Sequence, residues 1–237
     1  MYGLSAVTAV TAQDTNGVSD VHPIPADIVL AQIERVVQDV KVAAVKTGML
    51  ATADIVQVVA ETLSRLKLRN VVVDPVLASG GQPARTLLAP DAVSLLKARL
   101  LPLAAVVTPN AGEAAALCGF EVNSLDAARE AARRIAGFGP RAVVIKGGHL
   151  DGPQAIDLLF HDGVFTEFAA PRAEIGVMHG TGCTFASAIA AGLAHGCGVA
   201  TAVNLAKRYV TGAIEQSFSI GHGARILNHF WDQPSPG

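Results

Sequence analysis

The chain has 237 residues, of which 51% are hydrophobic and 16% are charged, and its formal net charge is −2. This charge provides no basic surface for nucleic acid, and polar residues interrupt every apolar stretch that could otherwise span a bilayer. The three cysteines lack metal-binding spacing, so we expect free thiols in an intracellular protein. We therefore predict one soluble, cytoplasmic α/β domain over residues 1–237, with neither nucleic acid nor a membrane as a partner.

The first part of the chain predicts a β-hairpin followed by alternating helices and strands. Residues 4–12 and 18–24 are both strand-like, and the Asn16-Gly17 dipeptide between them is a strong turn signal. Pro25 precedes a run in which apolar residues recur at helical spacing. The elements expected next are a helix over 28–40, a strand over 42–46, a helix over 55–66, a strand over 71–74, a helix over 91–101 and a strand over 104–107.

The second part of the chain continues this alternation. We expect helices on both sides of Ser124, then a strand over 142–145 and a hairpin over 156–169. Two helices follow, one from Thr181 and one over 199–217. Strands that alternate with helices predict a mostly parallel sheet that is covered by helices on both faces.

Polar or glycine-rich residues follow the expected strands. Ligands of open parallel sheets bind outside the carboxyl ends of the strands. Any one strand end needs turn residues, so a single such group has an equally good structural explanation, but their recurrence predicts one shared cleft. The groups are Gln13; Thr47-Gly48-Met49; Asp74-Pro75-Val76; Thr108-Pro109-Asn110 with Glu113; and Lys146-Gly147-Gly148-His149.

The segment His179-Gly180-Thr181-Gly182-Cys183-Thr184 comes immediately before a clearly helical run. Glycines at this place let the backbone N–H groups of the first helical turn point at one spot, where the helix dipole favours negative charge. The segment Gly180-Thr181-Gly182-Cys183 therefore predicts an anion hole for a phosphoryl group, and the alternative is a glycine-rich turn that only starts the helix. No P-loop motif occurs in the sequence.

Cys183 has two interpretations. A thiol at a helix N-terminus, among amide donors, is favoured as the thiolate, which would suit a catalytic base near neutral pH. The alternative is that this small, polarisable side chain packs against the substrate. Between the two, we favour the base.

Acidic and amide side chains at the strand ends predict a metal and nucleotide site. Asn110 and Glu113 are three residues apart at a helix start, so they lie on one face. Together with Asp74 they could hold Mg²⁺ through water, because Mg²⁺ binds few carboxylates and completes its shell with water and substrate phosphates. Lys146 would neutralise ATP phosphates, although a solvated lysine at a strand end is an equal alternative. Helix capping and dipole compensation are the structural alternatives for the two acidic residues.

Several motifs occur together, in order, over nearly the whole chain. They are Thr11-Ala12-Gln13-Asp14-Thr15-Asn16-Gly17-Val18, Lys46-Thr47-Gly48-Met49-Leu50, Val73-Asp74-Pro75-Val76, Thr108-Pro109-Asn110 with Glu113, Val144-Ile145-Lys146-Gly147-Gly148-His149, the segment from His179 to Thr184, and Gly221-His222-Gly223. In this combination the chain resembles the ribokinase-like superfamily and, within it, the hydroxymethylpyrimidine kinase branch. Cysteine at position 183 is typical of that branch and of some related pyridoxal kinases, whereas many sugar kinases of the superfamily carry aspartate there.

The resemblance implies a three-layer α/β/α fold with a mostly parallel central sheet and a small N-terminal β-hairpin flap. It implies a kinase that uses ATP and Mg²⁺ to phosphorylate 4-amino-5-hydroxymethyl-2-methylpyrimidine, and then its monophosphate, in thiamine biosynthesis. It also implies a homodimer. By the same resemblance Gln13 contacts the pyrimidine, while Met49 and Val76 line its pocket. It places Lys146 and Thr181 at the ATP phosphates and makes Gly180 to Cys183 the anion hole. We predict Asn110 as a further residue that binds ATP.

The resemblance has one gap. Family members begin with an additional strand and a glycine-rich turn whose aspartate contacts the pyrimidine, and this sequence contains no copy of that segment. Loss of a strand exposes backbone donors and apolar sheet surface. We therefore expect weaker substrate binding and weaker activity than in a full-length relative.

Three other functions fit parts of the pattern. A pyridoxal kinase, or an enzyme that serves both rings, comes first because the two pockets differ by few residues. A non-enzymatic pyrimidine binder that keeps the fold comes second, although Lys146, Cys183 and Glu113 argue against it. A sugar kinase comes third, because it would favour aspartate at position 183.

Overall fold

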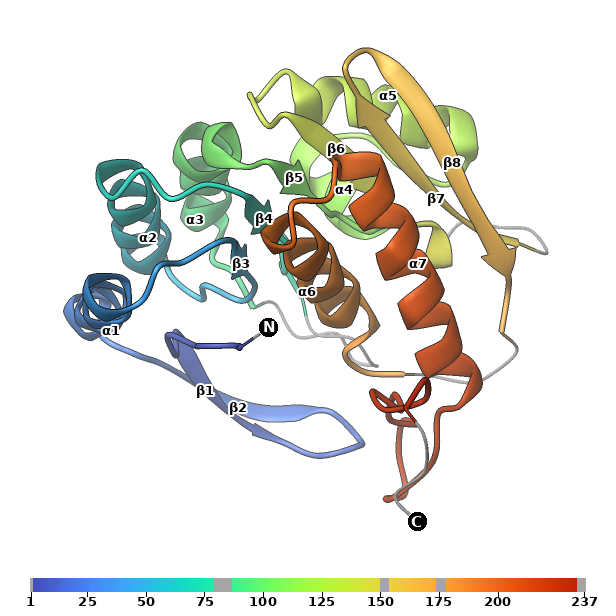
Figure 1. Cartoon of the computed structure of the whole chain (residues 1–237), viewed down its shortest axis with the longest axis horizontal. Helices are drawn as coiled ribbons and strands as arrows, with labels where there is room; N and C mark the ends of the chain where they lie inside the picture. The colour runs from blue at the N-terminus through green and yellow to red at the C-terminus, as the bar shows by residue number, and fades with distance from the viewer. Residues whose placement is uncertain (1, 79–86, 150–153, 174–177, 234–237) are drawn as a thin grey trace.

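Figure 1 shows a computed structural model of the chain, in which one sheet lies between two layers of helices. The structure describes residues 2–78, 87–149, 154–173 and 178–233. The sheet has the strand order β3-β4-β5-β6-β7-β8, in which β3 to β6 pair in parallel and β7 and β8 pair antiparallel. Its strands are β3 (Val45–Thr47), β4 (Val71–Val73), β5 (Val106–Val107), β6 (Ala142–Ile145), β7 (Gln154–His161) and β8 (Val164–Pro171).

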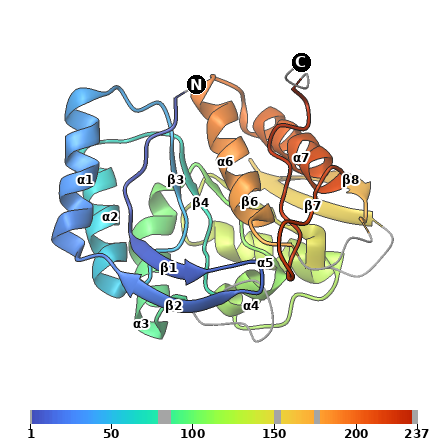
Figure 2. The same ribbon diagram turned by 90° about the horizontal axis from the view of Figure 1, so that it is seen from below.

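Helices cover both faces of the sheet. The last two, α6 and α7, pack on one face, while α1 to α5 pack on the other (Figures 1 and 2). Among the described residues, none of the helices combines the length and the apolar character that a membrane span requires. The helices are α1 (Ala26–Asp39), α2 (Ala53–Arg65), α3 (Pro90–Leu95), α4 (Ala111–Cys118), α5 (Leu125–Ala136), α6 (Thr181–Ala194) and α7 (Val199–Glu215), with short helical turns at Leu96–Leu100, Leu101–Leu103 and Gly147–His149.

The core is divided into two halves by the sheet. Within β4 the side chain of Val72 packs in the cluster formed with α6 and α7, while Val71 and Val73 pack in the cluster on the opposite face. Successive side chains of a strand point to opposite faces, so both faces of this strand must be apolar. The three layers confirm the predicted α/β/α architecture with a mostly parallel sheet.

Several strands differ from their predicted ranges. The strand predicted over 4–12 is confined to Ala9–Gln13, and the strand predicted over 71–74 ends at Val73. Two others are the strands before and after it in the sheet. The strand predicted over 42–46 begins only at Val45, because the carbonyl oxygen of Ala43 accepts a hydrogen bond from the side chain of Asn70 (3.0 Å) rather than from a ladder amide. The strand predicted over 104–107 is likewise confined to β5. Both strands still end where the polar residues begin, which is the feature that positions the site.

The N-terminal hairpin forms a separate two-stranded sheet, made of β1 (Ala9–Gln13) and β2 (Val18–Pro23). In Figure 1 it lies below the main sheet, on the side at which α6 begins. Its turn docks on a loop near the C-terminus: the carbonyl oxygen of Thr15 accepts from the N–H of Ala224 (2.7 Å), and its hydroxyl oxygen accepts from the N–H of Gly223 (3.2 Å). The predicted hairpin flap is therefore confirmed, and it is fixed at its tip.

We expect Gly223→Ala to release the hairpin from this loop. A β-carbon at position 223 would lie 2.2 Å from the carbonyl oxygen of Thr15, so one of the two backbone segments must move. An undocked two-stranded hairpin is only marginally stable. Hydrogen exchange should therefore become faster for the amides of β1 and β2 and stay unchanged in β4.

The control for this experiment is Gly3→Ala, where an added β-carbon would meet nothing within 4 Å. It should leave exchange in the hairpin at the wild-type rate. Unchanged exchange in Gly223→Ala as well would contradict the docking of the hairpin tip.

Candidate active site

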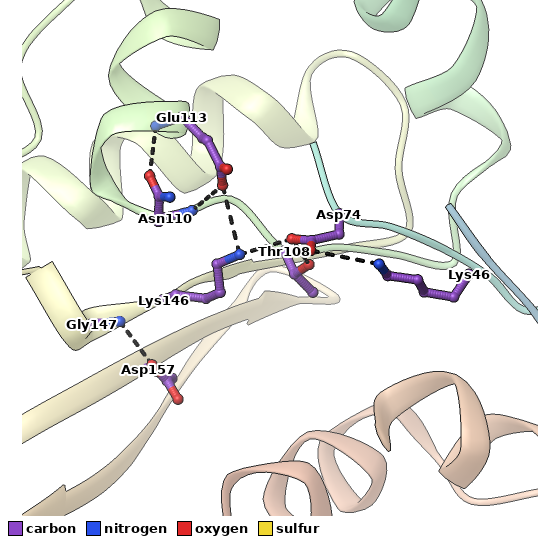
Figure 3. A network of polar contacts seen from close by, with 8 residues as sticks. All are labelled: Lys46, Asp74, Thr108, Asn110, Glu113, Lys146, Gly147 and Asp157. Atoms are coloured by element: carbon purple, nitrogen blue, oxygen red, sulfur yellow. Dashed lines mark hydrogen bonds and ion pairs between the residues drawn. The ribbon is translucent and has the colours of Figure 1, made fainter. Parts of the chain in front are cut away.

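A buried carboxylate, that of Asp74, lies at the centre of a polar cluster at the carboxyl ends of β3 to β6 (Figure 3). Asp74 directly follows β4 and is 2% exposed. Its Oδ1 atom accepts hydrogen bonds from Lys146 Nζ (2.8 Å) and from the hydroxyl group of Thr108 (3.1 Å). Its Oδ2 atom lies 3.9 Å from Lys46 Nζ. Residues from four strand ends therefore converge on one carboxylate.

Backbone pairing positions Lys146 just beyond β6. Its N–H donates to the carbonyl oxygen of Pro109 (2.9 Å), which aligns it with the start of α4. Its Nζ atom lies 2.8 Å from Asp74 Oδ1 and 3.6 Å from Glu113 Oε2. Burial opposes the ammonium charge more than any other single influence, but the attraction of the two carboxylates outweighs it and raises the pKa of Lys146. The side chain is therefore charged at neutral pH.

Asn110 and Glu113 form a capping box at the start of α4. Asn110 Oδ1 accepts from the N–H of Glu113 (2.8 Å), and Glu113 Oε2 accepts from the N–H of Asn110 (2.7 Å). Burial raises the pKa of Glu113, while the attraction of Lys146 opposes this shift. Glu113 thus has the capping role that its position in the sequence allows, and its carboxylate also faces the ammonium group of Lys146.

The start of α6 presents backbone N–H groups without internal partners. Gly180 is the N-cap residue, in the left-handed conformation with φ of 86°, and no side chain caps the helix. The N–H of Thr184 donates to the carbonyl oxygen of Gly180 (2.8 Å). Within the described ranges, the N–H groups of the three residues between them have no hydrogen-bond acceptor. These groups, on Thr181, Gly182 and Cys183, are therefore free to bind an anion.

The start of α6 also abuts the cluster around Asp74. A β-carbon added at Gly182 would lie 2.9 Å from Lys146 Nζ and 3.9 Å from Asp74 Oδ2. A side chain at position 182 would have to displace the lysine head group from its present place beside the helix backbone. The unpaired N–H groups and the ammonium group thus lie side by side, and this combination can bind a phosphoryl group.

The other predicted site residues lie outside this hydrogen-bonded cluster. Met49 and Val76 follow the neighbouring strands β3 and β4, and both are partly buried. Gln13 ends β1 and is exposed, and its side chain has no hydrogen-bond partner in the described part of the chain. Cys183 is exposed and lines a cavity of about 650 Å³ between α6 and α7, of which Lys146 is not part. The structure therefore brings the predicted metal and nucleotide residues together, and the predicted pyrimidine residues are separate from them.

The sequence analysis assigned no role to two charged residues of this region, Lys46 and Asp157, although Lys46 begins one of the quoted motifs. Lys46 and Lys146 each stand two positions before a glycine at a strand end, namely Gly48 and Gly148. This shared spacing is the signal that could have identified Lys46. No such signal marks Asp157, because both of its partners are distant in the sequence.

Asp157, in β7, holds the turn that follows Lys146. Its Oδ1 atom accepts from the N–H of Gly147 (2.7 Å), and its Oδ2 atom pairs with Lys207 Nζ from α7 (3.0 Å). The turn also passes close to β7, because a β-carbon at Gly147 would lie 1.8 Å from the carbonyl oxygen of Ile156. A buried ion pair and a close backbone contact therefore fix the direction in which Lys146 points.

We expect Asp157→Asn to destabilise the fold by about 3 kcal/mol, because it leaves the ammonium group of Lys207 buried without its counter-charge. Asparagine keeps an oxygen that can accept from the N–H of Gly147. The loss of unfolding free energy therefore measures the contribution of the ion pair. Urea unfolding of Asp157→Asn, Lys207→Met and the double variant provides the measurement. The double variant should be more stable than Asp157→Asn alone. If the two single variants lose free energies of unfolding that simply add in the double variant, the side chains of Asp157 and Lys207 do not act as a pair.

The buried carboxyl group of Glu113 predicts a dependence of stability on pH. Its pKa is raised above the ordinary value of 4.5, so the folded chain holds this proton more tightly than the unfolded chain does. Ionisation therefore costs stability as the pH rises through the window that begins near 4.5. Glu113→Gln cannot ionise, so its Tm should rise relative to wild type as the pH increases above about 4.5.

The slope of this Tm difference, rather than its absolute size, is the test, because the variant also loses the attraction to Lys146. Glu121→Gln, at an exposed position, controls for the change in net charge. A Tm difference that stays constant over the whole range would show that burial does not disfavour the charged form of Glu113.

Comparison with known proteins agrees with this geometry. The chain matches the family model described as phosphomethylpyrimidine kinase over residues 1–228. It is 46% identical over 230 residues to the hydroxymethylpyrimidine/phosphomethylpyrimidine kinase of Streptomyces coelicolor, with 97% of this chain and 84% of that protein covered. It is 45% identical over 228 residues to the thiamine biosynthesis bifunctional protein ThiED of Geobacter sulfurreducens. That alignment covers 96% of this chain and 46% of the relative, so the chain spans about half of the bifunctional protein.

Solved structures show the same similarity. An ADP complex of the pyridoxal kinase of Bacillus subtilis has a TM-score of 0.88 at 35% identity, over 97% of this chain and 86% of that one. The phosphomethylpyrimidine kinase of Clostridium difficile has a TM-score of 0.78 at 38% identity, over 90% and 87%. These similarities confirm the predicted ribokinase-like fold and the predicted family. The chain belongs to the phosphomethylpyrimidine kinase family.

Proposed function

We propose that this chain is an ATP-dependent kinase that phosphorylates 4-amino-5-hydroxymethyl-2-methylpyrimidine, and then the resulting monophosphate, in thiamine biosynthesis. Its family and the names of its relatives support this acceptor. The observation that carries the proposal is the contact between the start of α6 and Lys146, where unpartnered N–H groups lie beside an ammonium ion. That pairing suits a phosphoryl group in transfer.

In the first reaction the hydroxyl oxygen of the acceptor attacks the γ-phosphorus of ATP. The bond from this phosphorus to the β,γ-bridging oxygen breaks, and ADP leaves with the electron pair. Negative charge spreads over the transferring group and the leaving group. In this proposal the N–H groups from Gly180 to Cys183 hold the transferring group, Lys146 neutralises the ATP phosphates, and Asn110 and Thr181 contact the nucleotide.

The acceptor hydroxyl group must lose a proton in this first reaction, and Cys183 is the base that we propose. Cys183 belongs to the first turn of α6, whose N–H groups form the proposed phosphoryl site, and its thiol group is exposed. In the second reaction the attacking atom is a phosphate oxygen that has already lost its proton. The second reaction therefore needs no base, which separates the two steps experimentally.

We propose Mg²⁺ as the metal of the ATP complex. Asp74 Oδ2 and Glu113 Oε1 accept no hydrogen bond from the described residues, so each can accept one from a metal-bound water. In the described ranges no group of three or more metal-ligating side chains occurs, which leaves the ATP phosphates and water as the main ligands. The ion would supply charge neutralisation on the ATP phosphates.

The pyrimidine is proposed to lie between the hairpin and the ends of β3 and β4. The unpaired side chain of Gln13 would contact its polar edge, while Met49 and Val76, which are partly buried, would line its apolar face.

We further propose a cytoplasmic homodimer. Val10 on β1 is 55% exposed and is an apolar side chain that a partner hairpin would cover.

Pyridoxal is a second candidate acceptor, and the similarity to a pyridoxal kinase structure favours it. The hydroxymethyl group on an aromatic ring is common to both acceptors, so the phosphoryl site would be the same. The difference between the two functions lies in the ring pocket, which only acceptor assays can compare.

A coupled assay that measures ADP release provides the test. We expect ADP release with both the pyrimidine alcohol and its monophosphate, and slower ADP release with pyridoxal. Lys146→Met should lower kcat by about 100- to 1,000-fold, because it removes a charged donor from the transferring group. Cys183→Ala should slow phosphorylation of the alcohol more than phosphorylation of the monophosphate, since only the alcohol needs a base.

Lys41→Met, at an exposed position, is the matched control and should keep the wild-type rate. Turnover of pyridoxal alone would support the second candidate. Binding of ATP and the alcohol without ADP release would indicate a non-catalytic pyrimidine binder, and either result would overturn the proposed function.

A further inference from the structure

Asp74 has a second lysine beside it, on the side opposite to Lys146. Lys46 is the middle residue of β3, and its Nζ atom lies 3.9 Å from Asp74 Oδ2, whereas Lys146 Nζ lies 2.8 Å from Oδ1. The longer distance is outside hydrogen-bond range, so the ammonium group of Lys46 donates no hydrogen bond to this carboxylate. Asp74 is the one ion-pair partner of Lys46 in the described part of the chain. Its three N–H donors therefore remain available for a ligand.

Both lysine head groups lie over glycine backbone. A β-carbon added at Gly48 would lie 2.8 Å from Lys46 Nζ, just as one at Gly182 would lie 2.9 Å from Lys146 Nζ. Gly48 comes two residues after Lys46, and the side chains of a strand alternate, so the lysine folds along its own strand toward the carboxyl end. Its charge is thus directed to the edge of the sheet where Lys146 and the start of α6 meet.

The two lysines differ in how far their charge is neutralised. Lys146 has two carboxylates, those of Asp74 and Glu113, within 3.6 Å. Lys46 shares only the first of these, at 3.9 Å, and its side chain is 20% exposed compared with 14% for Lys146. The positive charge of Lys46 is therefore the less neutralised of the two, and it lies next to the proposed phosphoryl site.

The two proposed reactions need different amounts of positive charge. In the first, a neutral alcohol attacks the γ-phosphorus, so only the ATP phosphates are anionic at the start. In the second, an oxygen of the acceptor phosphate, which carries a charge of about −2 near neutral pH, forms the new bond to the γ-phosphorus. The bond to the β,γ-bridging oxygen breaks and ADP leaves with the electron pair, as before. Two anions must then approach each other, which requires a further cation.

We propose that Lys46 binds the phosphate of the monophosphate acceptor and so enables the second phosphorylation. This inference rests on the proposed function, whose two acceptors differ by that phosphate. Lys146 serves the phosphates of ATP in both reactions, while Lys46 distinguishes the charged acceptor from the neutral one. Gly48 leaves the space that the head group of Lys46 occupies.

The test compares kcat/KM for the alcohol and for its monophosphate, each at saturating Mg-ATP, in wild type and Lys46→Met. We expect a loss of about 10- to 100-fold with the monophosphate, the range of one charge-assisted hydrogen bond, and a loss of about threefold or less with the alcohol. Lys46→Arg should restore most of the activity with the monophosphate, because it keeps the charge and the donors. Lys41→Met, at an exposed position, controls for the change in net charge.

A second variant tests the same inference without removal of the charge. In Gly48→Ala the added β-carbon would displace the Lys46 head group. The value of kcat/KM should therefore again fall more with the monophosphate than with the alcohol. If Lys46→Met lowers kcat/KM equally for both acceptors, Lys46 would instead serve to position Asp74, and the proposal would be overturned. Wild-type kinetics for both acceptors would make it an ordinary solvated lysine. A wild-type chain that phosphorylates neither acceptor would overturn the proposed function itself, and this inference with it.

Discussion

Lys146 and Asp74 directly follow β6 and β4, two strands separated by β5, and their side chains meet at 2.8 Å where little solvent reaches. Removal of either partner would leave an uncompensated buried charge, which is among the costlier changes in a protein interior. The ion pair therefore requires β4, β5 and β6 to end at one level, with Thr108 bonded to the same carboxylate. It also sets the position of α6, because Gly182 lies directly against the lysine head group.

The rest of the region supports this ion pair from outside. The turn after Lys146 is held by Asp157 in β7, whose charge is balanced by Lys207 in α7. The capping box of Asn110 and Glu113 fixes the start of α4 and presents a second carboxylate to the same ammonium group. Charges of alternating sign thus run from α7 through the sheet to α4. Pairing therefore holds the charged side chains of this region in place in the folded chain.

The fold, the family and much of the cluster could be predicted from the sequence. Apolar strands that alternate with helices indicate a parallel sheet, and parallel strands bring their carboxyl ends to one edge, so Asp74, Glu113 and Lys146 were expected to lie close together. Strand limits were predicted less well, because they depend on which partner takes each carbonyl group, as at Ala43. The roles of the pyrimidine-pocket residues and of Cys183 remain predictions.

By itself, the sequence determined which elements form and which polar groups end the strands, because periodicity and turn chemistry are local. Only the tertiary structure decided that Lys46 shares a carboxylate with Lys146 and that Asp157 pairs with a lysine from α7. It also decided that Thr15 docks on a loop 208 residues further along the chain. These contacts join side chains from elements that are distant in the sequence, and their geometry arises only when the helices pack against the finished sheet.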